Sequence, residues 1–287
     1  MQIISPKAQL ILESLGRFKY LTASQMLALG IAKHDSNLRP ILAKLRDLKY
    51  CDQLSFGFMP QVGKLENFHY LTKVGAELIA TATYHIDDLK EIKYPRNTGS
   101  LFANDYLHRK STIDFYTAFY LWTKQHQIEI IEANYYFDTR GANHVKNAEK
   151  GSLESRNKLI LNDTAFITPD FIARINGDNR DYLFIAEIHR GADTKRLFKQ
   201  LLWHASIAGE GIAQEKYDYN RGIKVYIALE KSELIPLIIK RIKETPELDG
   251  FRDMFLFTSL AAMANDFFGS WADVSLNKRN FIESREV

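Results

Sequence analysis

The stretch TPDFIARINGDNRDYLFIAEIHR, from Thr168 to Arg190, decides the fold of the second part of the chain. Two short apolar segments flank the residues NGDN at 176–179, a pattern typical of a β-hairpin turn. Because side chains alternate faces along a strand, Glu187 and His189 share one face. Closure of the hairpin at this turn would bring Asp170, at the start of the first strand, beside both of them.

Asp170 and Glu187 would then repel each other. Two carboxylates about 4 Å apart repel by roughly 4 kcal/mol at an effective dielectric constant near 20. Such a pair needs a proton or a cation between its members. The sequence therefore predicts a divalent metal site at Asp170 and Glu187.

Composition indicates a globular protein without a membrane anchor. The chain has 287 residues, of which 46% are hydrophobic and 25% charged, enough for one large domain or two ordinary ones. A single cysteine, Cys51, excludes an internal disulfide and favours a reducing compartment. The beginning of the chain lacks the pattern of a signal peptide, and no apolar run approaches a membrane span. We therefore expect a cytoplasmic location and no membrane partner.

Positive charge is concentrated in the first third of the chain. Residues 1–98 hold 13 Lys and Arg against 9 Asp and Glu, a net charge of +4 within an overall net charge of +3. This asymmetry favours contact with nucleic acid in that part of the chain.

The first third has the element order of a small DNA-binding domain. A helix is predicted over 6–16, and a second begins at the N-cap Thr22, with Gln25 completing a capping-box pattern, and ends near Gly30. A third helix follows residue 35, and two strands and a short helix follow over 50–80.

The third helix carries a leucine stripe and a polar face. Asp35 or Ser36 can cap it, and Pro40 is tolerable in a first turn. Three helices followed by a two-stranded wing are typical of a winged helix-turn-helix, whose third helix enters the DNA major groove. We place such a domain at 1–90, and protein contacts remain the alternative use of this fold. The predicted DNA-contacting residues of the helix are Asn37, Arg39, Lys44 and Arg46.

The second part of the chain has a different order of elements. Loss of periodicity over 82–100 predicts a domain boundary there. A helix over 101–127, a strand over 128–138 and a polar, structureless segment from 138 to 162 precede the hairpin. The later elements are helices over 193–208 and 233–244 and strands over 223–229 and 254–260.

This order predicts an α/β domain over 100–287 with a restriction-endonuclease-like mixed sheet flanked by helices. Asp170, Glu187 and His189 fall at the positions of the PD-(D/E)xK motif of that superfamily, with His189 in place of the lysine. A histidine, whose ordinary pKa is near 6.5, could accept a proton from the attacking water.

Other residues are secondary candidates. Glu132 could complete the metal site or be an ordinary strand acid, and Gln200 could contact the substrate or lie on a solvated face. Lys195 and Arg196 are phosphate contacts if DNA binds. His108 and Asp114 lie six residues apart, which favours packing or DNA contact over joint catalysis.

The chain also resembles the replication-relaxation family, which includes the MOBC-type plasmid relaxases. The resemblance spans residues 8–208 as spaced motifs: ILESLGRFKYLTASQML, LRPILAKLRDLKY, HYLTKVGAELI, LHRKSTIDFYTAF, PDFIA and AEIHRGADTKRLFKQLLWH. It aligns His108 with the family's helix histidine, Asp170 with its strand acid, and Glu187 with the acid before the Arg-Gly turn.

The resemblance implies a plasmid mobilisation relaxase that uses Mg²⁺ or Mn²⁺ to nick DNA at a transfer or replication origin. Its partners would be origin DNA and other mobilisation proteins. The alternatives are a non-catalytic replication initiator or transcriptional regulator, and a restriction-type endonuclease. The sequence has neither the His-hydrophobic-His pair of the common relaxases nor a phosphate-binding P-loop, so we expect no use of ATP.

Overall fold

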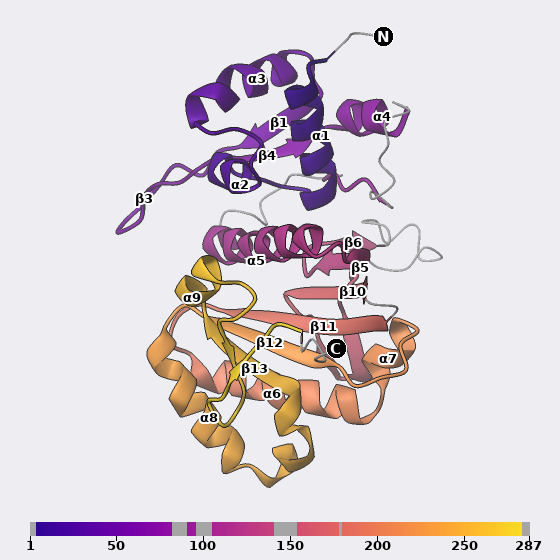
Figure 1. Ribbon diagram of the computed structural model, residues 1–287, viewed down its shortest axis with the longest axis vertical. Coiled ribbons are helices and arrows are strands. Elements are labelled where there is room, and N and C mark those ends of the chain that lie inside the picture. The colour runs from indigo at the N-terminus through magenta and orange to yellow at the C-terminus, as the bar shows by residue number, and fades with distance from the viewer. Residues whose placement is uncertain (1–3, 82–90, 96–104, 141–153, 178–179, 283–287) are drawn as a thin grey trace. The chain divides into compact units, whose positions relative to one another are not determined.

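The computed structural model describes residues 4–81, 91–95, 105–140, 154–177 and 180–282. The protein is a mixed α/β chain that divides into two compact units, Met1–Thr117 and Ala118–Val287 (Figure 1). Among the described residues, none of the helices combines the length and apolarity needed to cross a bilayer. The domain boundary expected over 82–100 falls mostly outside the described residues.

The first unit begins with three helices, followed by paired strands and a fourth helix. Strands β1 and β4 pair antiparallel, and β2 and β3 form a short hairpin between them. The first predicted strand, over 50–58, is divided into β1 and the start of β2, whereas the second, over 66–71, corresponds to β4 alone. The elements are α1 (Pro6–Phe18), α2 (Ala23–Ala28), α3 (Asp35–Asp47), β1 (Cys51–Leu54), β2 (Phe58–Met59), β3 (Gly63–Lys64), β4 (Phe68–Leu71) and α4 (Lys73–Thr81).

Local sequence signals fix the helix ends, with one correction. The predicted capping box is confirmed, because the Thr22 amide donates to Gln25 Oε1 at 2.9 Å and the Gln25 amide donates to Thr22 Oγ1 at 3.3 Å. In α3, however, the N-cap is His34 without a side-chain cap, so the prediction of an Asp35 or Ser36 cap was wrong. Pro40 is also beyond the first turn, where it cannot donate to the carbonyl four residues earlier.

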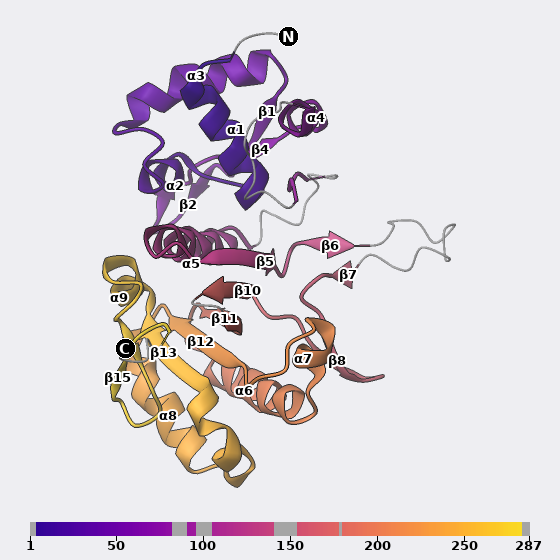
Figure 2. The same ribbon diagram turned by 45° about the vertical axis from the view of Figure 1, so that its right-hand side comes forward.

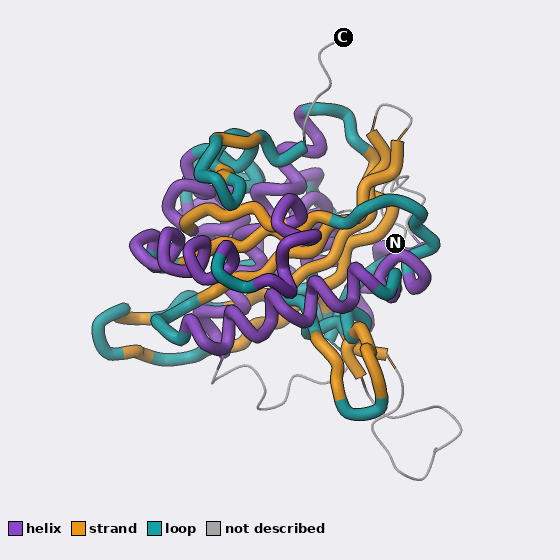
Figure 3. The backbone as a smooth tube through the Cα atoms, turned by 90° about the horizontal axis from the view of Figure 1, so that it is seen from below, coloured by secondary structure: helices purple, strands orange, loops and turns teal. Residues whose placement is uncertain are grey.

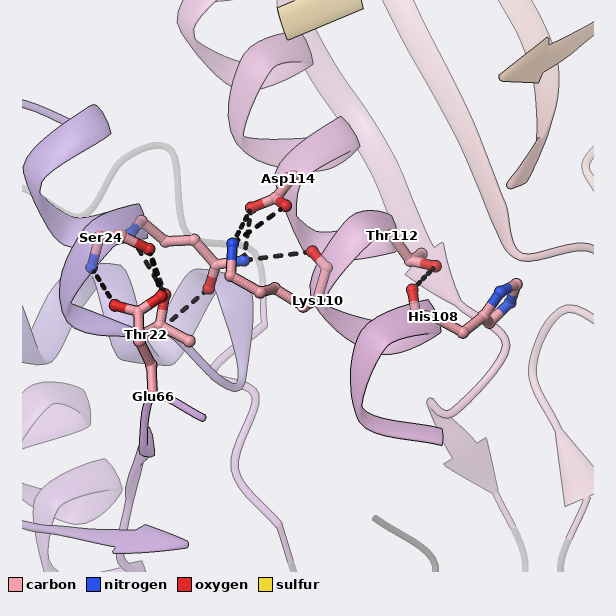
Figure 4. Close-up of polar contacts among 8 residues, drawn as sticks. Thr22, Ser24, Glu66, His108, Lys110, Thr112 and Asp114 are labelled. Atoms are coloured by element: carbon pink, nitrogen blue, oxygen red, sulfur yellow. Dashed lines mark hydrogen bonds and ion pairs between the residues drawn. The ribbon is translucent and has the colours of Figure 1, made fainter. Parts of the chain in front are cut away.

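A polar cluster joins α2 to the helix α5 (Tyr106–Gln125) within the first unit (Figure 4). Gln25 Nε2 donates to Asp114 Oδ1 at 2.8 Å and to the Lys110 carbonyl at 3.2 Å. Nearby, the Ser24 hydroxyl and amide both donate to the Glu66 carboxylate, at 2.7 and 2.9 Å. These bonds fasten α2 to the first half of α5 and to the segment before β4.

The described part of the second unit is built on a seven-stranded sheet of order β15-β14-β13-β12-β11-β10-β5. Strands β5, β10 and β11 are antiparallel neighbours, whereas β11, β12 and β13 run parallel (Figure 1). Figure 3 draws the strands in orange and the helices in purple. The strands are β5 (Glu129–Tyr135), β10 (Phe171–Gly177), β11 (Arg180–His189), β12 (Lys224–Leu229), β13 (Phe255–Ser259), β14 (Trp271–Ala272) and β15 (Lys278–Arg279).

Helices and aromatic side chains cover the two faces of this sheet. Apolar side chains of α6 and α8 pack with one face in a single core. On the opposite face, Phe119 from the second half of α5 contacts Phe171, Phe184 and Phe281. The remaining helices are α6 (Thr194–Gly209), α7 (Ile212–Lys216), α8 (Ile235–Lys243) and α9 (Leu260–Asn265), with 3₁₀ segments η3 (Ser232–Leu234) and η4 (Pro246–Met254).

The segment 138–162 corrects the prediction of a structureless loop. Its described ends form β6 (Thr139–Arg140), β7 (Glu154–Ser155) and β8 (Leu159–Asn162). Strand β6 pairs with β7, and β8 pairs with β9 (Ala165–Ile167). Strands β6 and β7 are two polar residues each, and β8 and β9 are only four and three residues long, so hydrophobic periodicity alone does not reveal them. Residues 141–153 lie outside the described residues.

Candidate functional site

The predicted hairpin is confirmed and sets the geometry of the site. Phe171 of β10 lies opposite Ala186 of β11, and the register continues to Gly177 opposite Arg180. Asp170 therefore lies at the mouth of the hairpin, where its Oδ2 accepts a 2.7 Å hydrogen bond from the Ile188 amide.

Asp170, Glu187 and His189 lie on the same face of the sheet. Alternation along each strand puts their side chains on the side covered by α6, together with the buried Ile172 and Ile185. Asp170 is 8% exposed, whereas Glu187 and His189 are each 2% exposed. The three residues that the sequence predicts to meet are thus almost entirely removed from water.

The carboxyl groups of Asp170 and Glu187 are in direct contact. Burial raises the pKa of Glu187 well above its ordinary value, and the charge of Asp170 and a side-chain hydrogen bond between the two carboxyls raise it further. The positive charge of Arg196 acts in the opposite direction. A hydrogen bond between two carboxyls requires a proton, which is one of the two ways to satisfy such a pair.

His204 is a site residue that strand alternation does not predict. Its Nε2 atom lies 2.7 Å from Glu187 Oε1, and its side chain is fully buried in α6. Burial lowers the pKa of His204 to about 3, so this imidazole is neutral near pH 7. One hydrogen bond joins the two side chains, whichever of them donates it. Among the described residues, His204 Nδ1 has no hydrogen-bond partner.

Helical spacing connects His204 with two predicted site residues. Arg196, Gln200 and His204 recur every four residues along α6 and so lie along one side of the helix. Arg196 is exposed, Gln200 half-buried and His204 buried, so the row runs from solvent into the carboxyl pair. The spacing of His204 from Gln200 is the signal by which the sequence could have revealed it. Lys195 is exposed on a different side of the helix.

Glu132 is not brought to the carboxyl pair. It lies on β5 opposite Arg174, which is four residues along β10 from the Asp170 position, or about 13 Å of strand. Its exposed carboxylate accepts a 2.6 Å hydrogen bond from Asn134 Nδ2.

The predicted DNA-contacting side chains of α3 are mostly exposed. Asn37, Arg39 and Lys44 are exposed and Arg46 is half-buried, while Leu38, Leu42 and Leu45 are buried on the other side. Arg39 Nε donates to Asp35 Oδ2 at 2.6 Å, so part of the charge of Arg39 is compensated within the helix. A basic face therefore remains around Lys44.

His108 is half-buried on the first half of α5. Its backbone carbonyl accepts a 3.0 Å hydrogen bond from Thr112 Oγ1, and its imidazole is directed away from Lys110 and Asp114 (Figure 4). The structure therefore does not bring His108 and Asp114 together.

The donor set of the carboxyl pair fits a hard divalent cation. Mg²⁺ prefers oxygen ligands and is commonly held by one or two carboxylates, with water and substrate phosphate completing its shell. Asp170 and Glu187 supply two adjacent carboxyls whose shared proton a cation could replace. Among the described residues, no three or more His, Cys, Asp and Glu side chains are grouped so that they could hold a metal ion together.

Comparisons with known proteins return no match: none of the family models, curated proteins or solved structures is similar to this chain.

Proposed function

We propose that this chain binds plasmid DNA and cleaves one strand by metal-dependent phosphodiester chemistry, as a relaxase or nickase. The observation that carries the proposal is the contact between Asp170 and Glu187, two buried carboxyls at the ends of neighbouring strands. Such pairs are unfavourable for folding unless they hold a proton or a cation, so they are typical of functional sites.

The arrangement of the second unit supports a restriction-endonuclease-like domain. Helix α5 precedes three antiparallel strands, and helix α6 then leads to the parallel strand β12. In that fold the paired acids lie at the second and third of these strands; here Asp170 directly precedes β10 and Glu187 lies on β11.

The arrangement of the first unit supports a winged helix that docks on DNA. Helices α1 to α3 precede the β1–β4 pair, and the β2–β3 hairpin corresponds to a wing. Helix α3 would then be the recognition helix, with Lys44 and Arg46 directed at the phosphate backbone or base edges.

In this proposal Asp170 and Glu187 hold Mg²⁺ or Mn²⁺, which would neutralise phosphate charge and activate the attacking water. His204 fixes one oxygen of Glu187 through the 2.7 Å contact. His189 lies on the same face two residues further along β11 and would accept a proton from that water. Gln200 and Arg196 lie on the row that leads to solvent and would contact the phosphate backbone.

A second candidate function is a non-catalytic initiator or regulator that only binds DNA. One observation favours it: Glu187 already has a hydrogen-bond partner in His204 at 2.7 Å, and its raised pKa favours a protonated carboxyl that needs no cation. In such a protein the pair would be a structural feature of the core, and the charged face of α3 would carry the function.

Metal binding separates the two candidates. We expect the full chain to bind Mn²⁺ in a titration followed by calorimetry, with release of a proton because Glu187 must ionise. Asp170→Ala and Glu187→Ala should each abolish binding, while Glu233→Ala, at an exposed acid in η3, should not. Equal Mn²⁺ binding by all four proteins would exclude the proposed centre.

A further inference from the structure

The β8–β9 hairpin, whose first strand is labelled in Figure 2, carries an exposed apolar pair, Ile160 and Phe166. Leu159 pairs with Ile167, and both side chains are buried in the core beside α6. Ile160 pairs with Phe166 on the opposite face, where the two residues are 51% and 50% exposed. The outer face of a surface hairpin usually carries polar residues. The exposed pair is therefore a candidate contact surface for a binding partner.

The position of the hairpin relative to Asp170 is fixed. Phe166 precedes Asp170 by four residues, so their Cα atoms are at most about 14 Å apart. Asn157 Nδ2 donates to the carbonyls of Asn134 and Pro169, each at 3.0 Å, and ties the beginning of the hairpin to the residue before Asp170. The exposed pair therefore lies within a few nucleotides of a phosphate bound at the carboxyl site.

Positive charge accompanies the aromatic ring. Lys158 Nζ lies 4.7 Å from the centre of the Phe166 ring, and it also forms a 3.6 Å ion pair with Glu154. Lys216 Nζ donates to the Lys158 carbonyl at 2.8 Å and to the Arg156 carbonyl. An aromatic ring with a lysine beside it is a typical surface for stacking a nucleobase next to a phosphate chain.

The exposed area of this pair favours a nucleobase over a protein as its binding partner. With about half of each side chain exposed, Ile160 and Phe166 together present an apolar area on the order of 200 Å². A stable protein interface needs about 800 Å² on each partner. One stacked base, by contrast, needs only a single ring-sized surface.

We infer that Phe166 and Ile160 form a stacking platform for an unpaired base of the DNA strand that lies across the Asp170–Glu187 site. The inference rests on the proposed function, since it takes DNA as the substrate, and it extends that function by specifying a locally unpaired strand. Base pairs in an intact duplex hide their faces from such a platform, so it discriminates in favour of unpaired DNA.

The test uses the full chain in EDTA, where binding is measured apart from cleavage. Fluorescence anisotropy of labelled oligonucleotides compares a single strand with the corresponding duplex. Phe166→Ala should weaken single-strand binding about tenfold, the effect of removing one aromatic stacking partner, and leave duplex binding nearly unchanged. Phe166→Trp should restore single-strand binding. The control is Leu237→Ala, at a 59% exposed apolar residue of α8, which should change neither affinity.

Oligonucleotides that lack a single base give a sharper form of the test. The abasic site is moved along the strand, and binding is measured at each position. At one position the affinity lost by removing the base and the affinity lost by Phe166→Ala should not be additive. Additive effects at every position would overturn the inference. So would equal losses on single strand and duplex, or a change in molar mass of the protein on Phe166→Ala, which would indicate a second copy as the occupant.

The outcomes also separate this inference from the proposed cleavage. Binding that depends on Phe166 in a protein that never nicks DNA would uphold the platform and reject the nuclease. Nicking by a protein whose single-strand affinity is insensitive to Phe166→Ala would reject the platform alone. A wild-type chain without measurable affinity for single-stranded DNA would also overturn the inference.

Discussion

Glu187 Oε1 and His204 Nε2 are 2.7 Å apart, and both side chains are buried. The contact joins strand β11 to helix α6 and places a neutral imidazole against one oxygen of a carboxyl whose pKa is raised by burial and by Asp170. A side chain that orients a metal-binding carboxylate in this way fixes the geometry of the centre. Substitutions at Glu187 and at His204 should therefore change the stability of the protein in different ways.

Glu187→Gln should stabilise the metal-free protein. Burial and the charge of Asp170 raise the pKa of Glu187, so the folded chain binds this proton more tightly than the unfolded chain. The resulting stability is fully present below the ordinary pKa of 4.5 and is lost as the pH rises through the raised value. Because glutamine cannot ionise, the advantage of the variant should grow with pH above 4.5, by about 1.4 kcal/mol per pH unit until the folded-state pKa is reached.

Urea unfolding in EDTA at several pH values measures this effect. Added Mn²⁺ should reverse the order, because it stabilises only the protein that can bind it. A Glu187→Gln protein that is less stable than wild type at every pH would show that ionisation of Glu187 does not destabilise the folded chain.

His204→Leu should destabilise the protein by about 1–3 kcal/mol, because it leaves a buried Glu187 oxygen without its hydrogen-bond partner. His204→Gln should recover part of this loss, since an amide can donate or accept in the same place. The measurement is urea unfolding of the two variants at one pH. Equal losses for leucine and glutamine would indicate that the imidazole only fills space.

Lys44→Ala should weaken DNA binding and reduce the slope of log affinity against log salt by about 0.9, the effect of losing one phosphate contact. Arg39→Ala should have a smaller effect, because its charge is partly compensated by Asp35. Lys73→Ala, on α4, removes the same charge from a different helix and serves as the control. If the slopes of the Lys44 and Lys73 variants were the same, α3 would not be the docking helix.

His189→Ala should slow nicking strongly and leave Mn²⁺ affinity almost unchanged, because His189 is expected beside the metal rather than bound to it. His189→Lys should keep part of the activity and change the pH profile, since lysine supplies charge but is rarely deprotonated near neutrality. Pseudo-first-order nicking rates across a pH series test both variants. Near-normal rates for His189→Ala would reduce this residue to a hydrogen-bonding role.

Local sequence patterns predicted the parts of the structure that depend on neighbouring residues. The turn at 176–179 and two-residue alternation were sufficient to place Asp170 beside Glu187, and the Thr22–Gln25 capping box appears as expected. The leucine stripe of α3 likewise separated its buried side from its basic side.

Features that depend on distant packing were not predictable in this way. The four-residue spacing from Gln200 puts His204 on the same side of α6, but its contact with Glu187 depends on how α6 packs on the sheet. The β8–β9 hairpin begins in a mostly polar segment, and its strands are only four and three residues long. Strand alternation puts Glu132 on the same face as Asp170. The pairing register, however, sets Glu132 opposite Arg174, four residues along the chain from Asp170.

Strand cleavage of supercoiled plasmid DNA tests the central claim most directly. The substrate is a plasmid that carries the DNA on either side of the gene for this chain, incubated with the full protein and Mg²⁺ or Mn²⁺. We predict that wild type converts it to the open circular form, that EDTA stops the reaction, and that Asp170→Ala and Glu187→Ala each abolish nicking while DNA binding persists. Undiminished nicking by both variants, or DNA binding by wild type without nicking in either metal, would contradict a nuclease centre at these two carboxyls.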